Sequence, residues 1–219
     1  RAREIIEKAD LVFTLDFNSL DRSGSMVSAL QACESTFVMI DHHQSPGTYA
    51  QITYSDPEMS STCEMVYHFI QALGEGDRID ANIAACLYTG ILTDTGSFRF
   101  SNTNQAAFAI SHEMTELGVD PYIVAQRVFG TYSLERIKLL NLALDSLEIS
   151  KNGKLSVMTV TNAMFDFTKT QPEDVDGMIN YARRIQDVKV AALIQVTRAA
   201  KARDATGLGY LAFALSQGD

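Results

Sequence analysis

Residues 36–43 read TFVMIDHH, an apolar run that ends in a carboxylate and two imidazoles. The run 36–40 is short and rich in β-prone side chains, which predicts a buried strand. A second such run, residues 11–15, also stops at an aspartate, Asp16. Residues 25–33, between the two runs, have helical spacing, so strand, helix and strand alternate as they do in a parallel α/β sheet. In open α/β sheets ligands bind beyond the carboxyl ends of the strands, which makes both strand ends candidate sites.

Helical patterns dominate the chain between this sheet and residue 150. Ser61 and Glu64 have the spacing of a capping box, and Gly74 follows as a stop signal. Asp94 falls where another of these helices ends, just before a turn that contains glycine. Apolar residues at helical spacing predict four helices, over residues 61–73, 80–94, 104–117 and 133–147.

The pattern changes after Asn152-Gly153, a dipeptide typical of hairpin turns. Alternation then predicts a strand over 155–161, helical spacing predicts a helix over 173–184, and residues 188–196 are apolar. We therefore predict an α/β fold in which a linker helix joins a parallel-sheet domain to a smaller α/β domain. The predicted bounds are 1–130 for the first domain, 131–150 for the linker helix and 151–219 for the second domain.

Composition limits the kind of protein this can be. Hydrophobic residues make up 46% of the 219 residues and charged residues 21%, as in folded globular proteins. The apolar runs are too short to span a bilayer, so no membrane is expected. The net charge of -9 argues against binding long duplex nucleic acid by charge. The cysteines, Cys33, Cys63 and Cys86, form no C-x-x-C pair, which favours the reducing cytoplasm.

The candidate chemistry lies at the two strand ends. A single aspartate after a strand is ordinarily a turn or cap residue. Two adjacent histidines at a strand end have no such packing reason, and His42 and His43 are half of the four histidines of the chain. A carboxylate beside an imidazole can bind a divalent metal or orient a ring that does. Asp94 could close the same site from a third element.

Four segments match a known family, in the family's order along the chain. The longest reads LYTGILTDTGSFRF, and together with the DHH tripeptide it is very specific. On these segments the chain resembles the DHH phosphoesterases, in the branch of small oligoribonucleases and phosphoadenosine-phosphate phosphatases with a DHH-associated C-terminal domain. The matching segments are residues 15–22, 38–43, 60–62 and 87–100.

The resemblance implies a hydrolase with a pair of divalent cations, usually Mn²⁺, with Mg²⁺ or Co²⁺ as other options. Asp16, His42 and Asp94 would be the metal ligands. Asp41 would orient a neighbouring imidazole, and His43 would face the substrate phosphate. Two such cations lower the pKa of a bridging water and stabilise both oxygens of an in-line displacement at phosphorus.

Candidate substrate-binding residues follow from the same resemblance. Arg22 and Arg99 are candidates for contact with the substrate phosphate, because a guanidinium can bind two phosphate oxygens at once. Ser97 is a third candidate for substrate binding. Either arginine could instead form a surface ion pair. A cleft between two domains is a common place for a small-molecule site. On that ground Arg198, Lys201 and Arg203 of the second domain are further candidates, with a solvated charged loop as the alternative.

Two parts of the family pattern are missing. The family begins with a His-x-x-x-Asp-x-Asp type motif, but the first histidine here is His42. The family also ends with a Gly-Gly-Gly-His segment, whereas this sequence ends in Ser-Gln-Gly-Asp. We therefore expect a fragment that lacks both ends of its parent protein and is nearly inactive by itself.

Three functions stay open at this point. The first is metal-dependent hydrolysis of short oligoribonucleotides (nanoRNA, as an exonuclease), linear dinucleotides or 3'-phosphoadenosine 5'-phosphate. The second is hydrolysis of pyrophosphate or polyphosphate. The third is a catalytically degenerate nucleotide-binding protein. The expected partner is a short oligonucleotide or a small nucleotide phosphate, and a homodimer is an option.

Overall fold

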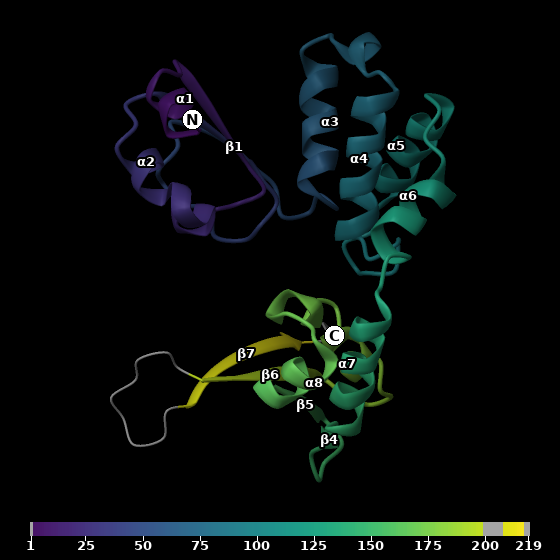
Figure 1. Ribbon diagram of the computed structural model, residues 1–219. Coiled ribbons are helices and arrows are strands. Elements are labelled where there is room, and N and C mark those ends of the chain that lie inside the picture. The colour runs from purple at the N-terminus through teal and green to yellow at the C-terminus, as the bar shows by residue number, and fades with distance from the viewer. Residues whose placement is uncertain (1, 199–207, 217–219) are drawn as a thin grey trace. The chain divides into compact units, whose positions relative to one another are not determined.

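The computed structural model describes residues 2–198 and 208–216. The chain divides into two compact units, Arg1–Val128 and Phe129–Asp219 (Figure 1). The predicted α/β fold with two sheets is confirmed, with one sheet in each unit. Within the described ranges, none of the helices is both long enough and apolar enough to cross a membrane.

The first unit contains a three-stranded parallel sheet in the order β1-β2-β3. The two predicted strands are present and pair in parallel, with Leu11 opposite Thr36. The third strand was not predicted, and it pairs with the other side of β2, with Ile40 opposite Tyr54. The bounds are β1 Leu11–Leu15, β2 Thr36–Asp41 and β3 Ile52–Ser55.

Helices make up the rest of the first unit. The helix predicted over 25–33 is wrong in part, because a 3-10 helix with a positive φ at Gly24 precedes a short α-helix. α6 was not predicted. The bounds are α1 Ala2–Glu7, the 3-10 helix η1 Leu20–Met26, α2 Val27–Gln31, α3 Thr62–Ala72, the 3-10 helix η2 Gly76–Arg78, α4 Ala81–Asp94, α5 Gln105–Glu116 and α6 Pro121–Phe129.

Side-chain caps fix where the three central helices begin. The Ser61 hydroxyl accepts the N–H of Glu64 at 3.0 Å, at the start of α3. Asp80 caps α4 and Asn104 caps α5 in the same way. Each cap satisfies backbone donors that have no partner inside the helix, so these starts are specified by the sequence.

Two clusters of buried side chains hold the first unit together. Val38 and Ile40 of β2 pack against Met65 of α3, which fixes this helix on the sheet. Ile91 of α4 and Met114 of α5 belong to the other cluster, between the helices. The sheet and the end of α4 are therefore both tied to α3.

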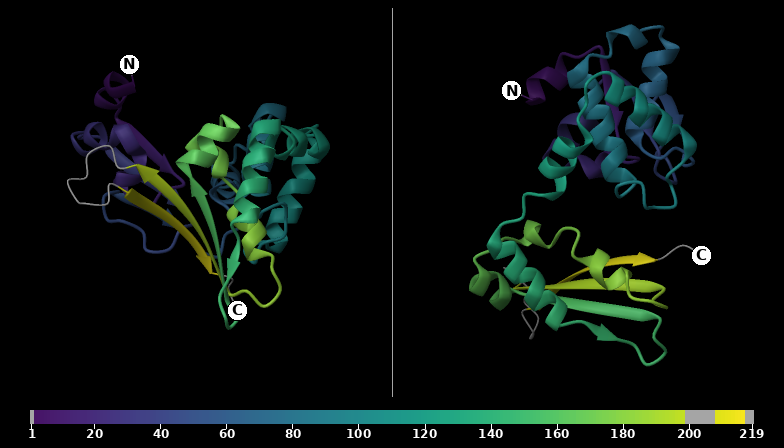
Figure 2. Two further views of the ribbon diagram at one scale, coloured as in Figure 1. Left: turned by 60° about the horizontal axis from the view of Figure 1, so that its bottom comes forward. Right: turned by 90° about the vertical axis from the view of Figure 1, so that its right-hand side faces the viewer.

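The second unit has a mixed four-stranded sheet in the order β4-β5-β6-β7. β5 and β6 run parallel, whereas the outer pairs β4-β5 and β6-β7 are antiparallel (Figure 2). The predicted turn at Asn152-Gly153 joins β4 to β5, with a positive φ at Gly153. The strands are β4 Glu148–Ile149, β5 Leu155–Thr161, β6 Val190–Arg198 and β7 Leu208–Ser216.

Helices pack on this second sheet around a core that includes Leu139, Met158 and Leu193. The single helix predicted over 173–184 is wrong, because Gly177 has a φ of +75° and separates two short helices. The helix predicted as a linker contributes Leu139 to this core, and any role in linking the units stays a prediction. The helices are α7 Leu134–Asp145, α8 Asn162–Thr168, the 3-10 helix η3 Pro172–Val175 and α9 Ile179–Arg183.

Candidate metal centre

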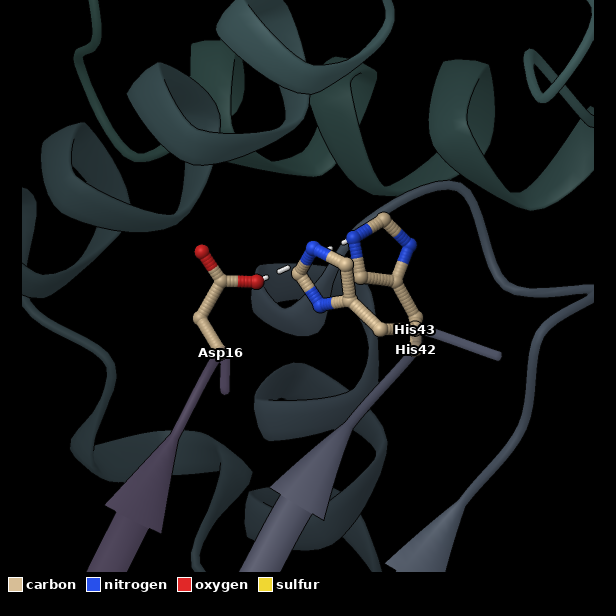
Figure 3. A group of neighbouring side chains, drawn as sticks. All are labelled: Asp16, His42 and His43. Carbon is tan, nitrogen blue, oxygen red and sulfur yellow. Dashed lines mark ion pairs between the residues drawn. The ribbon is translucent and has the colours of Figure 1, made fainter. Parts of the chain in front are cut away.

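The ends of β1 and β2 bring their polar side chains to one edge of the parallel sheet (Figure 3). The N–H of Asp16 still donates to the carbonyl of Ile40 at 3.1 Å, so the residue remains tied to the neighbouring strand. Asp16 has a φ of +68°, a left-handed conformation that aspartate tolerates better than most residues. The chain turns there, beside the histidines that follow β2.

The imidazole of His42 lies between two carboxylates from different elements. Its Nε2 is 3.7 Å from Oδ1 of Asp16 and 3.5 Å from Oδ2 of Asp94, the last residue of α4. One ligand atom from each of Asp16, His42 and His43 lies within 4.8 Å of the others. The structure thus brings together the residues predicted as metal ligands, and their role as ligands stays a prediction.

Hydrogen bonds orient two of these side chains. Nδ1 of His42 lies 3.2 Å from the carbonyl oxygen of Met59. A carbonyl can only accept, so Nδ1 carries the hydrogen. Nε2, the nitrogen that faces the carboxylates of Asp16 and Asp94, therefore keeps its lone pair. The hydroxyl of Thr62 donates to Oδ1 of Asp16 at 2.8 Å, at the start of α3.

His43 is oriented by the aspartate two residues before it. Its Nδ1 lies 2.7 Å from Oδ1 of Asp41, which is fully buried. This contact is the one expected if Asp41 orients an imidazole, although the catalytic roles of both residues stay predictions. The other carboxylate oxygen of Asp41 is buried and accepts no hydrogen bond from the residues that the structure describes.

Electrostatics at the cluster favour a cation. The pKa of Asp94 is raised by burial first and by the charge of Asp16 second, and the nearby histidines His42 and His43 partly offset this. Two neighbouring carboxylates, one of them desolvated, repel each other unless a positive charge lies between them. A divalent cation would supply that charge.

The donor atoms also fit a divalent cation by chemistry and by distance. Carboxylate oxygens and imidazole nitrogens suit Mn²⁺, Mg²⁺ or Co²⁺, whereas soft metals select thiolates. Two atoms that share one metal at bonds of about 2.1 Å lie at most roughly 4.2 Å apart. Both contacts of His42 Nε2 with carboxylate oxygens, at 3.7 and 3.5 Å, fall within this limit.

The predicted substrate-binding residues of the first unit lie in the turn after α4 and on η1. Ser97 lies in the turn after α4, where three successive residues from Gly96 have positive φ values. The Nε of Arg99 donates to the carbonyl of Gly96 at 2.6 Å, which bends this exposed side chain across the same turn. Arg22 is exposed on η1. Their roles stay predictions. The side chain of Arg198 and the residues Lys201 and Arg203 lie outside the described part of the chain.

Sequence reasoning missed several residues that support the site. Asn102 donates to the carbonyl of Ser60 at 2.7 Å and to that of Asp94 at 3.1 Å. Nothing in the sequence near Asn102 indicates this bridge. Thr62 falls in a segment that resembles the family, but no role was predicted for it. Its hydrogen bond to Asp16 depends on the tertiary fold.

Fold and site together define a class of protein: an α/β protein with a carboxylate and imidazole cluster at the carboxyl edge of a parallel sheet. Residues 1–91 match the DHH family, N-terminal domain. This match confirms the resemblance to the DHH family that the motifs of the chain predicted.

Relatives extend the similarity beyond this domain. The chain is 28% identical over 156 residues to a probable bifunctional oligoribonuclease and PAP phosphatase NrnA of Streptococcus mutans, over 71% of this chain and 49% of the relative. It is 27% identical over 135 residues to the bifunctional oligoribonuclease and PAP phosphatase NrnA of Bacillus subtilis, over 61% of this chain and 43% of the relative.

A solved structure is also similar to this chain. The crystal structure of an exopolyphosphatase-related protein from Bacteroides fragilis matches with a TM-score of 0.84 and 31% identity, over 89% of this chain and 57% of that protein. The chain spans about half the length of the curated relatives it matches.

Proposed function

We propose that the first unit carries the site of a metal-dependent phosphoesterase that acts on short oligoribonucleotides, linear dinucleotides or 3'-phosphoadenosine 5'-phosphate. The observation that carries the proposal is the contact of one imidazole, that of His42, with two carboxylates from separate elements. The names of the two NrnA relatives, oligoribonuclease and PAP phosphatase, support the first and the last of these substrates.

Asp16, His42 and Asp94 would hold the cation, for which Mn²⁺ is the first choice, with Mg²⁺ and Co²⁺ as alternatives. When bound, a divalent cation at this site activates a water and polarises a phosphoryl oxygen, and a pair of cations does both at once. The contribution of the chain is to fix the ligand atoms before substrate arrives. The bonds from Thr62 to Asp16 and from His42 to the Met59 carbonyl do this.

His43 would contact the substrate phosphate. Its Nδ1–H donates to Asp41, so Nε2 is the nitrogen left for a phosphoryl oxygen or for the proton of the leaving group. The buried carboxylate of Asp41 fixes the orientation of the ring through this contact at 2.7 Å. Asp41 would therefore act through His43.

Arg99, Arg22 and Ser97 would bind phosphate oxygens of the substrate. An arginine can bind two such oxygens at once, and a serine hydroxyl can donate to one. Arg99 and Ser97 belong to the turn that follows Asp94 in the chain, which places them near one ligand of the cluster. With a net charge of -9, the protein needs such local cations to recruit an anionic substrate.

Hydrolysis by the full-length gene product tests this function. The protein is stripped of metal, given Mn²⁺ and assayed with a diribonucleotide and with 3'-phosphoadenosine 5'-phosphate. We expect His42→Ala to lower turnover by at least about 100-fold, because loss of a ligand disturbs the preorganised site. His112→Ala is the matched control, since His112 is an exposed histidine of α5 whose Nε2 lies 3.7 Å from Glu116. Turnover that survives in His42→Ala would contradict the proposal.

Hydrolysis of polyphosphate is the second candidate function. The observation that favours it is the similarity to the exopolyphosphatase-related protein from Bacteroides fragilis. The same assay decides between the two when polyphosphate and pyrophosphate are offered beside the nucleotides. Faster release of phosphate from polyphosphate would replace our first choice. Mn²⁺ binding without hydrolysis of any of these substrates would favour a catalytically degenerate nucleotide-binding protein.

A further inference from the structure

Glu64 is a buried carboxylate that the proposed chemistry does not use. It lies in the first turn of α3, and only 1% of its surface is exposed. A carboxylate removed from water is costly unless hydrogen bonds compensate it. The sequence predicted a capping box, in which Glu64 would bind the N–H of Ser61. The structure shows a different use.

The carboxylate of Glu64 ties the loop before α3 to the start of α5. It accepts the N–H of Ser60 at 2.8 Å and also the hydroxyl of Ser60. From the other side, the amide of Asn104 donates to both of its oxygens, at 3.0 and 3.1 Å. His68, one turn along α3, is 3.9 Å away. Ser60 is itself fully buried, so these bonds fix its backbone.

The backbone held in this way contacts one candidate metal ligand directly and is joined to a second through Asn102. The carbonyl of Met59, the residue before Ser60, accepts the Nδ1–H of His42. The carbonyl of Ser60 accepts from Asn102, whose amide also binds the carbonyl of Asp94. One buried carboxylate therefore supports the backbone that binds His42, the residue after β2, and that Asn102 joins to Asp94, the last residue of α4.

We propose that Glu64 is a positioning residue of the metal centre: through Ser60 it holds the Met59 carbonyl that keeps the hydrogen of His42 on Nδ1. Nε2 then stays free to bind the cation. The inference rests on the proposed function. Its first consequence, the tautomer of His42, can nevertheless be measured without any metal. Loss of such outer contacts typically weakens metal binding by about 10- to 100-fold.

Glu64→Gln is the sharpest test, because the shape is kept and only the donor pattern changes. The glutamine oxygen can still accept from Ser60, but its amide then faces the amide of Asn104, donor against donor. Asn104 cannot flip to correct this, since its oxygen caps α5 by accepting the N–H of Ala107 at 2.8 Å. We expect the Kd for Mn²⁺ to rise by about 10-fold or more.

A second exchange should reverse the effect. In Glu64→Gln with Asn104→Asp, the new aspartate can cap α5 with one oxygen and accept from the glutamine amide with the other. The net charge equals that of the original chain. We expect recovery of Mn²⁺ affinity to within about threefold. Asn104→Ser is a milder variant that keeps a cap oxygen and removes only the donors to Glu64.

The spectroscopic readout is the nitrogen-15 NMR spectrum of His42 in the metal-free protein. It is recorded at a pH above the usual titration range of imidazole. The original chain should show a protonated Nδ1, and Glu64→Gln and Asn104→Ser should shift the signals toward a mixture of tautomers. Glu113→Gln is the matched control, because Glu113 of α5 accepts a hydrogen bond from Tyr67 of α3. Glu113 takes no part in the contacts of Glu64 and His42 described above. It should change neither readout.

Three results would overturn the inference. They are an unchanged His42 spectrum in folded Glu64→Gln, an unchanged Kd in that variant, and a double exchange that folds without recovery. Absence of Mn²⁺ binding in the original chain would instead count against the proposed function, while the His42 spectrum would still decide whether Glu64 sets the tautomer.

Discussion

The two units of this protein use similar elements and differ in where their strand ends meet. In the first unit all strands run parallel, so the residues that follow β1 and β2 meet at one edge. In the second unit two of the three strand pairs are antiparallel, so strand ends are divided between both edges. Among the side chains that the structure describes, the only triad spaced for a metal lies in the first unit.

This difference shows how topology creates a site. A parallel sheet places several chain turns side by side, and ligands bind there. Asp16 and His42 are far apart in the chain, but adjacent parallel strands make them neighbours. Among its described residues, the second unit has a packed core but no such cluster of ligand residues. Variants in one unit should therefore have effects that variants in the other do not.

The largest expected effect on stability comes from the second unit. Leu139 of α7 is fully buried in its core. Leu139→Ala should lower the free energy of unfolding by about 2–5 kcal/mol, through lost burial and the cavity left behind. Denaturant unfolding measures this, and calorimetry should show an unchanged Mn²⁺ affinity. A weaker affinity in the folded variant would mean that the second unit helps to form the metal centre.

The next effect concerns two cysteines of the first unit. Burial, followed by the charges of Asp94 and Asp16, raises the pKa of Cys63 to about 11. A raised thiol pKa keeps the neutral form at ordinary pH, so only about one Cys63 in a thousand is ionised at pH 8. Alkylation of Cys63 should be slow, and its rate should rise about tenfold per pH unit up to that pKa.

Cys86 is the internal control for this measurement, because it is exposed on α4. Mass spectrometry after brief treatment with iodoacetamide should find the label on Cys86 well before Cys63. Equal labelling of both at neutral pH would show that Cys63 is neither buried nor close to the two carboxylates.

A smaller effect is expected where α3 and α4 approach each other. A Cβ added at Gly90 would collide with the sulfur of Cys63. Gly90→Ala should therefore cost about 1–3 kcal/mol of folding free energy, since overpacked cores must shift. Mn²⁺ affinity should fall as well, because α4 carries Asp94 and α3 begins beside Asp16.

The contact itself can be relieved as a check. Cys63→Ala in the Gly90→Ala background removes the sulfur and should recover part of both losses in thermal unfolding and calorimetry. No recovery would place the strain elsewhere in the helix pair.

Local patterns predicted the elements that carry their own signals. The starts of α3, α4 and α5 could be predicted because a capping side chain stands at each of them. β3 could not, since Ile52–Ser55 is short and is defined by its pairing with β2. The helix over 173–184 was overpredicted because the spacing of apolar residues does not reveal the backbone conformation of Gly177.

The site was predictable only in part for the same reason. Asp16 and the Asp-His-His segment follow strands, and the rule on strand ends applies to them directly. The hydrogen bond from Thr62 to Asp16 joins residues 46 positions apart, and the amide of Asn104 reaches Glu64 over 40 positions. Such contacts depend on how α3 and α5 pack, which no local pattern encodes.

Titration of the metal-free protein with Mn²⁺, followed by calorimetry and electron paramagnetic resonance, tests the central claim most directly. Asp16→Asn keeps the shape of the side chain, and asparagine tolerates the positive φ at this position. Asp166→Asn, on the exposed side of α8 in the second unit, is the matched control. We predict that the original chain and Asp166→Asn bind Mn²⁺ alike and that Asp16→Asn binds at least about 10-fold more weakly. Equal binding by all three proteins, or no binding by the original chain, would contradict the account.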